Sequence, residues 1–251
     1  MGKSVVFANQ KGGVGKTTTA VNLGACLAEA GRKVLLVDFD PQANTSSGVG
    51  ADTTKPGIYE LLAAKVDVQQ AIQNTSVRGL RIITSSIHLT GATVELVHAQ
   101  ERDFRLKNVL ARVKPEFDYL FIDCPPSLGL LTVNGLVAAD SVIIPLQCEY
   151  YAMEGLSMLL QTIKRVQGKL NPALQIGGIL FTMYDTRTRL AHEVVKEVTG
   201  YFKEKVFRTI IPRNVRLSEA PSFGKPITQY DPQSIGALSY RKLAEEVLNH
   251  V

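Results

Sequence analysis

Short apolar runs alternate with stretches of helical periodicity along most of the chain. Runs rich in Val, Ile, Leu and Phe predict strands buried on both faces, at 4–9, 33–40, 80–86, 119–126, 141–147 and 175–184. Apolar positions at helical spacing predict helices over 16–30, 93–113, 154–169 and 189–204. This alternation favours an α/β fold, a doubly wound and mostly parallel sheet with helices on both faces. Residues 45–79 are the least regular part, and we expect a single domain over residues 1–251.

The composition narrows the class of protein. Hydrophobic residues make up 45% of the 251 residues and charged residues 20%, which is typical of a globular protein. The three cysteines, Cys26, Cys124 and Cys148, are widely spaced. This odd set favours a reducing compartment and argues against a disulfide framework and a zinc site. No apolar run approaches the roughly 18 residues that span a bilayer. We therefore expect a cytoplasmic protein with no membrane partner.

A glycine-rich segment, "KGGVGKTT" at 11–18, follows the first predicted strand and opens the first predicted helix. This is the context of a phosphate-binding loop, in which backbone N–H groups and the helix N-terminus surround phosphate oxygens. The motif predicts that Lys16 contacts the β- and γ-phosphates and that the Thr17 hydroxyl binds Mg²⁺. The residues expected to bind nucleotide here are Lys11, Gly12, Gly13, Val14, Gly15, Lys16, Thr17 and Thr18.

The loop departs from the usual pattern at its start. Gln10 stands where the first glycine is expected, and a second lysine, Lys11, follows it. In this respect the segment resembles the deviant Walker A motif of the ParA/MinD family of ATPases. The resemblance implies a P-loop fold, ATP and Mg²⁺ as cofactors, and an ATP-dependent homodimer. It also implies that Lys11 reaches the phosphates bound by the other subunit, where a cation stabilises the charge of the transferring phosphoryl group.

Two aspartates end the second predicted strand, in "VLLVDFDPQANTS". Asp38 and Asp40 are two residues apart and face the same way, at the edge where open α/β sheets bind ligands. An ordinary strand-end turn would explain the pair as well if the phosphate loop were absent. The family resemblance implies that Asp40 orients the attacking water, and that Lys11 and Lys16 are the other catalytic residues. Asp38 is then expected to have a structural role or to lie near the metal.

A third aspartate ends the apolar strand "YLFIDCPPS". Asp123 fits a Walker B carboxylate, which binds Mg²⁺ through water. The expected magnesium ligands are Thr17, Asp40 and Asp123, the two carboxylates through water. Cys124 is most simply a small buried residue.

Three C-terminal segments resemble chromosomal ParA proteins of the Soj type. They are "CEYYAMEGLSMLL" at 148–160, "IIPRNVRLSEAPSFGKPI" at 210–227 and "YDPQSIGALSYRKLAEEV" at 230–247. The resemblance implies that Pro212 and Asn214 contact the adenine. An amide can read the donor and acceptor edge of that base, although without the resemblance Pro212-Arg213-Asn214 would be taken as a turn.

Basic residues concentrate between Asp185 and Lys225. Nine Lys or Arg residues oppose five acids there, a net charge of +4 out of +5 for the chain. Such a region suits contacts to a phosphate backbone, which are salt-sensitive and independent of base sequence. The resemblance points to Arg187 and Arg216 as contacts to nonspecific double-stranded DNA, and we include Arg189. The lysines at 196 and 203 alternate with glutamates and fit a solvated helix face.

Together with the basic region, the resemblance implies an ATPase that partitions the DNA of a chromosome or plasmid. The family resemblance adds a ParB-type centromere-binding partner that stimulates slow hydrolysis, and a nucleoid-associated location. One alternative is a MinD-like membrane-cycling regulator, which needs a basic amphipathic C-terminal helix. The last helix instead carries both charge signs beside an apolar stripe, which favours core packing; the stripe is Tyr240, Leu243, Ala244, Val247, Leu248 and Val251. Another alternative is an electron donor like the nitrogenase iron protein, whose cysteines bridge a cluster between subunits.

Overall fold

A seven-stranded sheet, in the order β3-β4-β2-β5-β1-β6-β7, runs through the part of the chain that the computed structural model describes, residues 2–95 and 100–250. All neighbouring strands are parallel except β3 and β4, which are antiparallel. The strands are β1 Lys3–Phe7, β2 Val34–Asp38, β3 Ile72–Asn74, β4 Leu80–Ile83, β5 Tyr119–Asp123, β6 Ser141–Gln147 and β7 Gln175–Thr182. The fold class that the sequence predicts is confirmed, and each predicted strand lies within four residues of an observed one.

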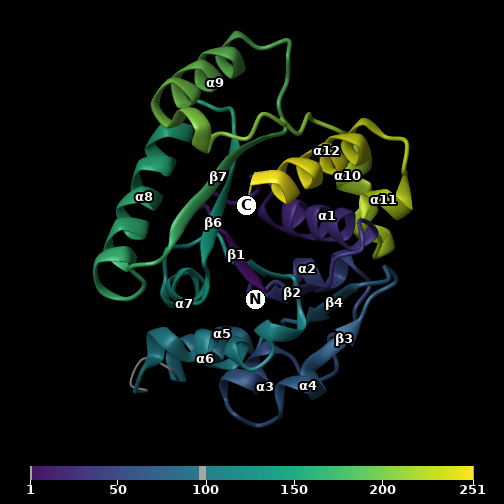
Figure 1. The fold of residues 1–251 in the computed structure, drawn as a ribbon, viewed down its shortest axis with the longest axis vertical. Helices are drawn as coiled ribbons and strands as arrows, with labels where there is room; N and C mark the ends of the chain where they lie inside the picture. Colours follow the sequence, from purple (N-terminus) through teal and green to yellow (C-terminus); the bar gives the residue numbers. More distant parts are fainter. Residues whose placement is uncertain (1, 96–99, 251) are drawn as a thin grey trace.

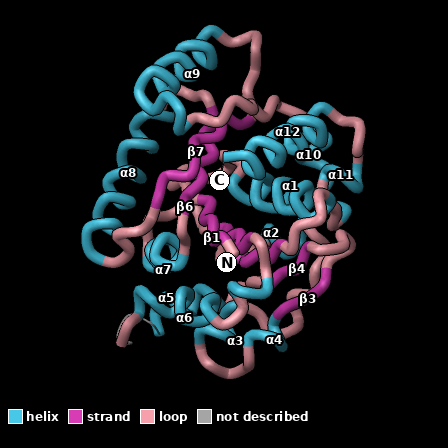
Figure 2. Tube along the Cα trace, viewed as in Figure 1, coloured by secondary structure: helices cyan, strands magenta, loops and turns pink. Residues whose placement is uncertain are grey.

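Helices cover both faces of the sheet. In Figures 1 and 2, α8 and α9 lie on one side of β6 and β7, and α1 and α12 lie on the other. The larger helices are α1 Lys16–Glu29, α5 Leu89–Glu95, α6 Arg105–Ala111, α7 Leu130–Ala138, α8 Ala152–Lys169, α9 Arg189–Phe202 and α12 Ile235–His250. Shorter ones are α2 Asn44–Gly48, α3 Ile58–Leu62, α4 Val68–Ala71, α10 Val215–Glu219 and α11 Ile227–Tyr230.

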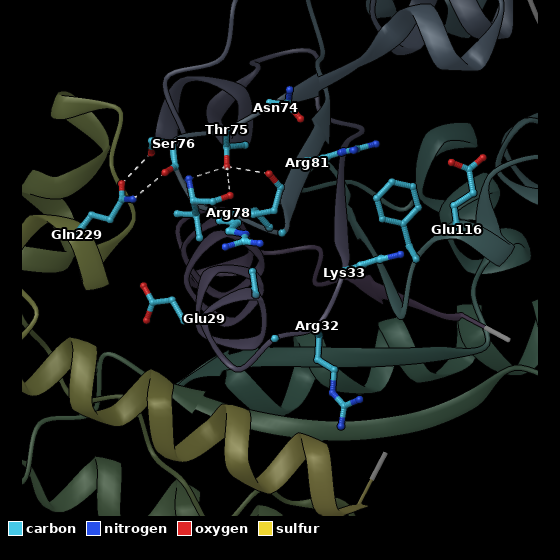
Figure 3. Close-up of a pocket in the computed structure, with 16 residues that line it drawn as sticks. Glu29, Arg32, Lys33, Asn74, Thr75, Ser76, Arg78, Arg81, Glu116 and Gln229 are labelled. Carbon is cyan, nitrogen blue, oxygen red and sulfur yellow. Dashed lines mark hydrogen bonds between the residues drawn. The ribbon is translucent and has the colours of Figure 1, made fainter.

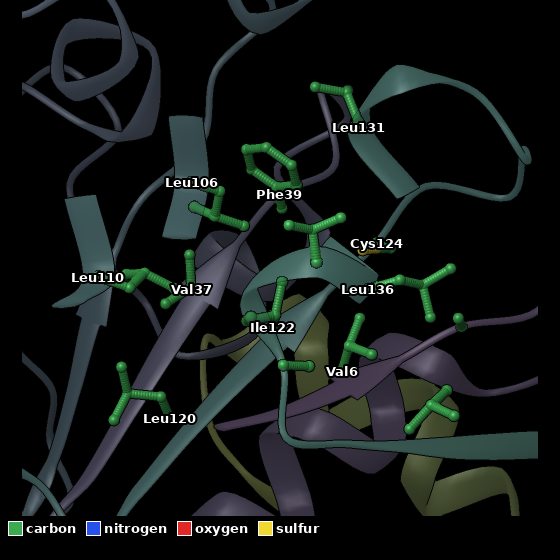
Figure 4. Packing of buried hydrophobic residues seen from close by; sticks show 14 of the residues in the cluster. Val6, Val37, Phe39, Leu106, Leu110, Leu120, Ile122, Cys124, Leu131 and Leu136 are labelled. Atoms are coloured by element: carbon green, nitrogen blue, oxygen red, sulfur yellow. The ribbon is translucent and has the colours of Figure 1, made fainter. Parts of the chain in front are cut away.

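The central strands are apolar throughout because successive side chains point to opposite, equally covered faces. Val6, Val37 and Ile122 belong to the cluster under α6 and α7 (Figure 4), whereas Phe7 and Phe121 belong to the cluster under α1 and α12. The rings of Phe7 and Phe121 pack edge to face with centroids 5.1 Å apart. This double burial fixes the strands whose carboxyl ends carry the site.

Two predictions of local structure need correction. The helix expected over 93–113 is wrong: α5 ends at Glu95, α6 begins at Arg105, and residues 96–99 lie outside the described residues. The irregular stretch 45–79 contains three short helices, α2 to α4, and the antiparallel edge strand β3, and the sequence analysis also missed α7. Short elements carry too few periodic positions to be recognised from pattern alone.

The outer edge of β7 is covered by the segment 206–213. The N–H groups of Phe207 and Ile211 donate to the carbonyls of Ile179 and Phe181, at 3.0 and 2.9 Å. Tyr184 and Pro212 form a further parallel bridge. Pro212 and the residues after it are thereby brought to the carboxyl end of the sheet, next to the loop that follows β1.

Candidate nucleotide site

The glycine-rich loop joins the end of β1 to the start of α1, as the motif predicts. Gly13 and Gly15 have φ of 73° and 85°, in the left-handed region that favours glycine. The Thr182 hydroxyl at the end of β7 donates to the Val14 carbonyl at 2.8 Å. The Asn9 carboxamide accepts from the Lys11 N–H at 3.0 Å and donates to the Pro145 carbonyl at 2.8 Å. The loop is therefore held from β6 and β7 before any phosphate binds.

A cavity of about 550 Å³ lies over the loop. It is lined by Gly12, Gly13, Gly15, Lys16, Thr17, Thr18, Val21, Asn22, Asp40, Gln42, Asn44, Ser47, Gly48, Pro126, Met183, Ser218, Ala220, Pro221 and Lys225. An adjoining cavity of about 290 Å³ shares Gly15, Thr18 and Met183 with it and is lined further by Pro212 and Asn214. Together the two cavities have room for phosphates over the loop and for a base beside them.

Lys16 is 6% exposed at the floor of the first cavity. Burial lowers the pKa of its ammonium, and this outweighs the carboxylates of Asp123 and Asp40, which raise the pKa. The Nζ donates to the Lys11 carbonyl at 3.3 Å. A buried ammonium with one neutral acceptor is ready for anionic oxygens, so the geometry supports the predicted contact to phosphate.

Asp123 lies beside Thr17, as the sequence predicts. Its Oδ2 accepts the hydroxyls of Thr17 and Thr45 at 2.6 and 2.7 Å, while its buried Oδ1 has no hydrogen-bond partner. Burial raises the pKa of Asp123 against the effect of those hydroxyls and of Lys16. An oxygen-only donor set with one unpartnered carboxylate oxygen fits the predicted Mg²⁺ site. Asp40, the third predicted ligand, lines the same cavity.

The two aspartates of the β2 end have different environments. Asp38 is completely buried, and its Oδ2 accepts the N–H and the hydroxyl of Ser46 at 2.8 and 2.7 Å. Burial and the charge of Asp123 on the next strand raise the pKa of Asp38. Asp40 is 7% exposed, and its Oδ1 accepts the Gln42 N–H at 3.0 Å. The structural role suits Asp38, which anchors α2, and Asp40 is the carboxylate that faces the cavity.

The smaller cavity, of about 290 Å³, is lined by Pro212 and Asn214, the two residues that the resemblance assigns to adenine. Asn214 is the N-cap residue of α10, and its Oδ1 accepts a hydrogen bond from the Leu217 N–H at 3.2 Å. Its amide N–H₂ remains to donate to a ring nitrogen of the base. Met183 also lines this cavity, with φ of 48°. Left-handed backbone in such a residue is uncommon and occurs where the surroundings enforce it.

The other signature lysine, Lys11, is absent from the lining of either cavity. Its ammonium pairs instead with the Glu149 carboxylate after β6, and the two side chains are 40% and 46% exposed. Lys11 and Lys16, five residues apart in one loop, therefore point to different places. No motif in the sequence singles out Glu149.

The predicted DNA-binding arginines lie at the carboxyl end of the sheet, each with a carboxylate partner. Arg187 pairs with Asp185 at 2.7 Å and Arg189 pairs with Glu193 at 2.9 Å. Arg216 pairs with Glu219 at 2.9 Å and Asp231 at 3.4 Å. Hydrogen bonds from Arg187 lower the pKa of Asp185. The Arg213 N–H donates to the Tyr184 carbonyl at 3.1 Å, so the segments around 187 and 213 are neighbours. Exposed pairs of this kind are weak and exchange easily for phosphate.

Several residues at the site were not found from the sequence. Thr45 and Ser46 bind the carboxylates of Asp123 and Asp38, and Thr182 and Met183 bound the cavities from β7. Hydroxyls are common in loops, so their type carries no signal by itself. The available signal was position, because Thr45 and Ser46 come a few residues after the predicted strand 33–40, and Thr182 and Met183 lie near the end of the predicted strand 175–184.

The strand order, the glycine loop after β1 and the carboxylates after β2 and β5 define a P-loop nucleoside-triphosphate-binding protein. The model of a family described as an AAA domain matches residues 2–176. The chromosome-partitioning ATPase Soj of Treponema pallidum is 63% identical over 248 residues, 99% of this chain and 98% of that protein. The sporulation initiation inhibitor protein Soj of Bacillus subtilis is 57% identical, over 98% of each. The chain belongs to the ParA/MinD family of ATPases, with the ParA and Soj proteins.

Solved structures agree with this assignment. A Mycobacterium smegmatis protein, described as cobyrinic acid a,c-diamide synthase with bound ADP and magnesium, superimposes with a TM-score of 0.87 at 40% identity. The alignment covers 100% of this chain and 95% of that one. The same protein has been solved with an ATP analogue and magnesium, at 39% identity.

Proposed function

We propose that this ATPase partitions DNA by switching between an ATP-bound sandwich dimer that binds DNA and a form that releases it. The observation that carries the proposal is the position of Lys11. It lies in the phosphate loop but outside the cavity of its own subunit, half-exposed and held by Glu149. A cation in this place is available to a second subunit, which makes closure depend on a bound triphosphate.

ATP and Mg²⁺ are the cofactors, consistent with the ADP, ATP-analogue and magnesium complexes of the Mycobacterium smegmatis structures. Lys16 and the loop N–H groups hold the phosphates, Pro212 and Asn214 flank the base, and Asp40 orients the water that attacks the γ-phosphorus. The water oxygen forms a bond to the γ-phosphorus as the bond between this phosphorus and the ADP oxygen breaks, which gives ADP and inorganic phosphate. Thr17 and Asp123 would hold Mg²⁺, and the ion would supply positive charge beside the phosphate oxygens. Lys11 of the partner subunit would add a further positive charge.

The DNA and partner roles extend this proposal. Arg187, Arg189 and Arg216 would exchange exposed carboxylate partners for DNA phosphates, a step that carries no base specificity. A ParB-type centromere-binding protein would accelerate hydrolysis, and the DNA would then be released. Because the ATP-bound form would bind DNA without base specificity, the cycle would take place on the nucleoid. The Treponema pallidum relative named for chromosome partitioning is 63% identical over nearly its whole length, more similar than the structure named for cobyrinic acid chemistry, at 40%.

The two alternatives fit the structure less well. The apolar stripe of α12 packs into the core, with Tyr240 and Val247 fully buried, so it is not available to a bilayer; Val251 lies outside the described residues. Within residues 2–95 and 100–250, no helix is both long and apolar enough to cross a membrane. Cys124, which an iron–sulfur protein would present to its partner, is completely buried.

Binding of nonspecific duplex DNA with ATP, with ADP and without nucleotide tests the proposal. Asp40→Ala should trap the ATP state and strengthen binding, and Arg216→Glu should abolish it. The proposal requires salt-sensitive binding with ATP alone, in parallel with dimer formation measured by light scattering. A protein that dimerises with ATP but binds no DNA in any state would contradict it, and lipid vesicles would be the next ligand to try.

A further inference from the structure

A second large hollow, of about 1150 Å³, lies at the amino-terminal ends of the strands, opposite the nucleotide site (Figure 3). It is formed by the end of α1, the starts of β2 and β4, the turn over 74–79 and Gln229 of α11. None of the motifs found in the sequence accounts for it.

Four exposed cations line this hollow: Arg32, Lys33, Arg78 and Arg81. Within the described part of the chain, none of the four forms an ion pair, whereas all three predicted DNA-binding arginines do. Two acids, Glu29 and Glu116, are also in the lining, and Glu116 accepts a hydrogen bond from Gln69 at 2.7 Å. The lining of the hollow therefore has an excess of positive charge.

The turn that carries Arg78 is held firmly. The Thr75 hydroxyl donates to the Leu80 carbonyl at 2.9 Å and accepts the Val77 N–H at 3.1 Å. The Val34 N–H donates to the carbonyl of Gly79 at 2.9 Å. Gly79 has φ of 87°, and a Cβ there would come within 3.1 Å of the Arg32 carbonyl. These contacts fix the backbone from which Arg78 and Arg81 project.

The hollow is joined to the surface that carries Arg216. The Ser76 hydroxyl donates to the Gln229 side-chain oxygen at 2.7 Å, and the Gln229 amide donates to the Ser76 carbonyl at 3.2 Å (Figure 3). The next residue, Tyr230, donates to Glu219 at 3.0 Å, and Glu219 is the partner of Arg216. In Figure 1, α10 and α11 lie on the same side of the molecule as β3 and β4. These contacts link Arg216, through α11, to the turn that carries Arg78.

We propose that this hollow extends the DNA-binding surface, so that the phosphate backbone of a duplex passes from Arg216 over α11 to Arg78 and Arg81. The inference rests on the proposed function and adds a surface to it. The side chains of Arg81 and Lys33 point the same way, Arg32 points away from them, and Arg78 lies nearer Gln229 (Figure 3). Cations that do not converge suit an extended polyanion, because one small phosphate ester can contact only some of them. Exposed arginines without base-reading partners suit backbone contact.

The test measures the salt dependence of DNA affinity for the ATP-bound protein. Arg78→Ala/Arg81→Ala is compared with Lys107→Ala/Lys169→Ala, a control that removes the same charge from exposed positions on α6 and α8. Each lost phosphate contact lowers the slope of log K against log salt by about 0.9. The arginine variant should therefore lose roughly 2 in slope for each subunit that engages DNA, while the lysine variant keeps the wild-type slope. ATP turnover and the thermal midpoint should be unchanged in both variants.

Three outcomes would overturn the inference. An unchanged slope in the arginine variant, with wild-type DNA binding intact, removes this surface and leaves the proposed function in place. A wild-type protein that binds no DNA with ATP fails the proposed function itself. In the third outcome, pyrophosphate binds the ADP-loaded wild type but not the arginine variant, and the salt slope of DNA binding is the same in both proteins. This result would assign the hollow to a small anion instead of DNA.

Discussion

The carboxyl ends and the amino ends of the strands differ in whether their charged side chains have protein partners. At the carboxyl ends, the charged groups that the sequence singles out are held by protein partners: Lys11 has Glu149, Asp38 has Ser46, and Asp123 has Thr17 and Thr45. At the amino ends, four exposed cations share a hollow without an ion pair in the described ranges. Partnered groups can exchange partners when nucleotide arrives, whereas unpartnered ones present a constant positive surface.

This difference suits a nucleotide-dependent switch at the carboxyl ends and a binding surface that does not change at the amino ends. Replacing an internal partner by a phosphate changes the local structure, because the released groups must move. A cation already exposed to water needs no such exchange. Matched substitutions at the two ends should therefore differ in kind, with effects on nucleotide chemistry at one end and none at the other.

The largest effect is expected for Lys16→Ala. It removes the buried ammonium that faces the phosphates, and ATP turnover should fall by about 10²-fold or more, the usual effect of losing a charge-stabilising group. Lys33→Ala at the other end is the matched control and should keep wild-type turnover. Phosphate release under saturating ATP and Mg²⁺ measures both. Equal losses in the two variants would mean that the contrast between the two ends is wrong.

Asp40→Ala and Asp38→Ala sharpen the comparison within the carboxyl end. Asp40→Ala should lower turnover by about 10²–10⁴-fold, the range for a lost proton-transfer or water-positioning group, with ATP still bound. Asp38→Ala leaves the Ser46 N–H and hydroxyl without an acceptor. The free energy of unfolding should therefore fall by about 1–3 kcal/mol.

Urea unfolding and single-turnover kinetics on both variants separate the two roles. The reverse pattern, in which Asp40→Ala loses stability and Asp38→Ala loses turnover alone, would exchange the assignments. ATP affinity, measured by fluorescence of a labelled nucleotide, shows whether binding survives in each variant.

Much of this site could be predicted from the sequence, because its parts are local. The loop at 11–18 and Asp40 come just after strands, Asp123 ends one, and parallel strands bring their carboxyl ends together. What the sequence could not predict depends on distant pairing. Glu149 meets Lys11 across 138 positions, and Ser76 meets Gln229 across 153. The helices between 44 and 71 were missed because four or five residues give no clear period.

Two glycines with the same backbone allow a smaller test. Gly15 in the phosphate loop and Gly31 after α1 both have φ of 85°. A Cβ at Gly31 meets nothing within 4 Å, and one at Gly15 meets Thr182 at 3.6 Å. Alanine should cost roughly 1–2 kcal/mol of stability at either place, the strain of left-handed backbone. Only Gly15→Ala should lose ATP affinity, since Gly31 lines the hollow at the other end. Retained affinity in Gly15→Ala would show that the loop tolerates strain and still binds phosphate.

The smallest effect concerns the ion pair between Lys11 and Glu149. Glu149→Gln keeps the size of the side chain and removes its charge, so Lys11 is released to serve a second subunit. Exposed pairs are worth at most about 1 kcal/mol. The ATP concentration that gives half-maximal dimer formation should therefore fall by up to about fivefold. Sedimentation over an ATP titration measures it, and Glu154→Gln, near the start of α8, is the control. If Glu149→Gln instead weakened the dimer, Glu149 would belong to the interface, and Lys11 would have a second partner there rather than a contact that holds it back.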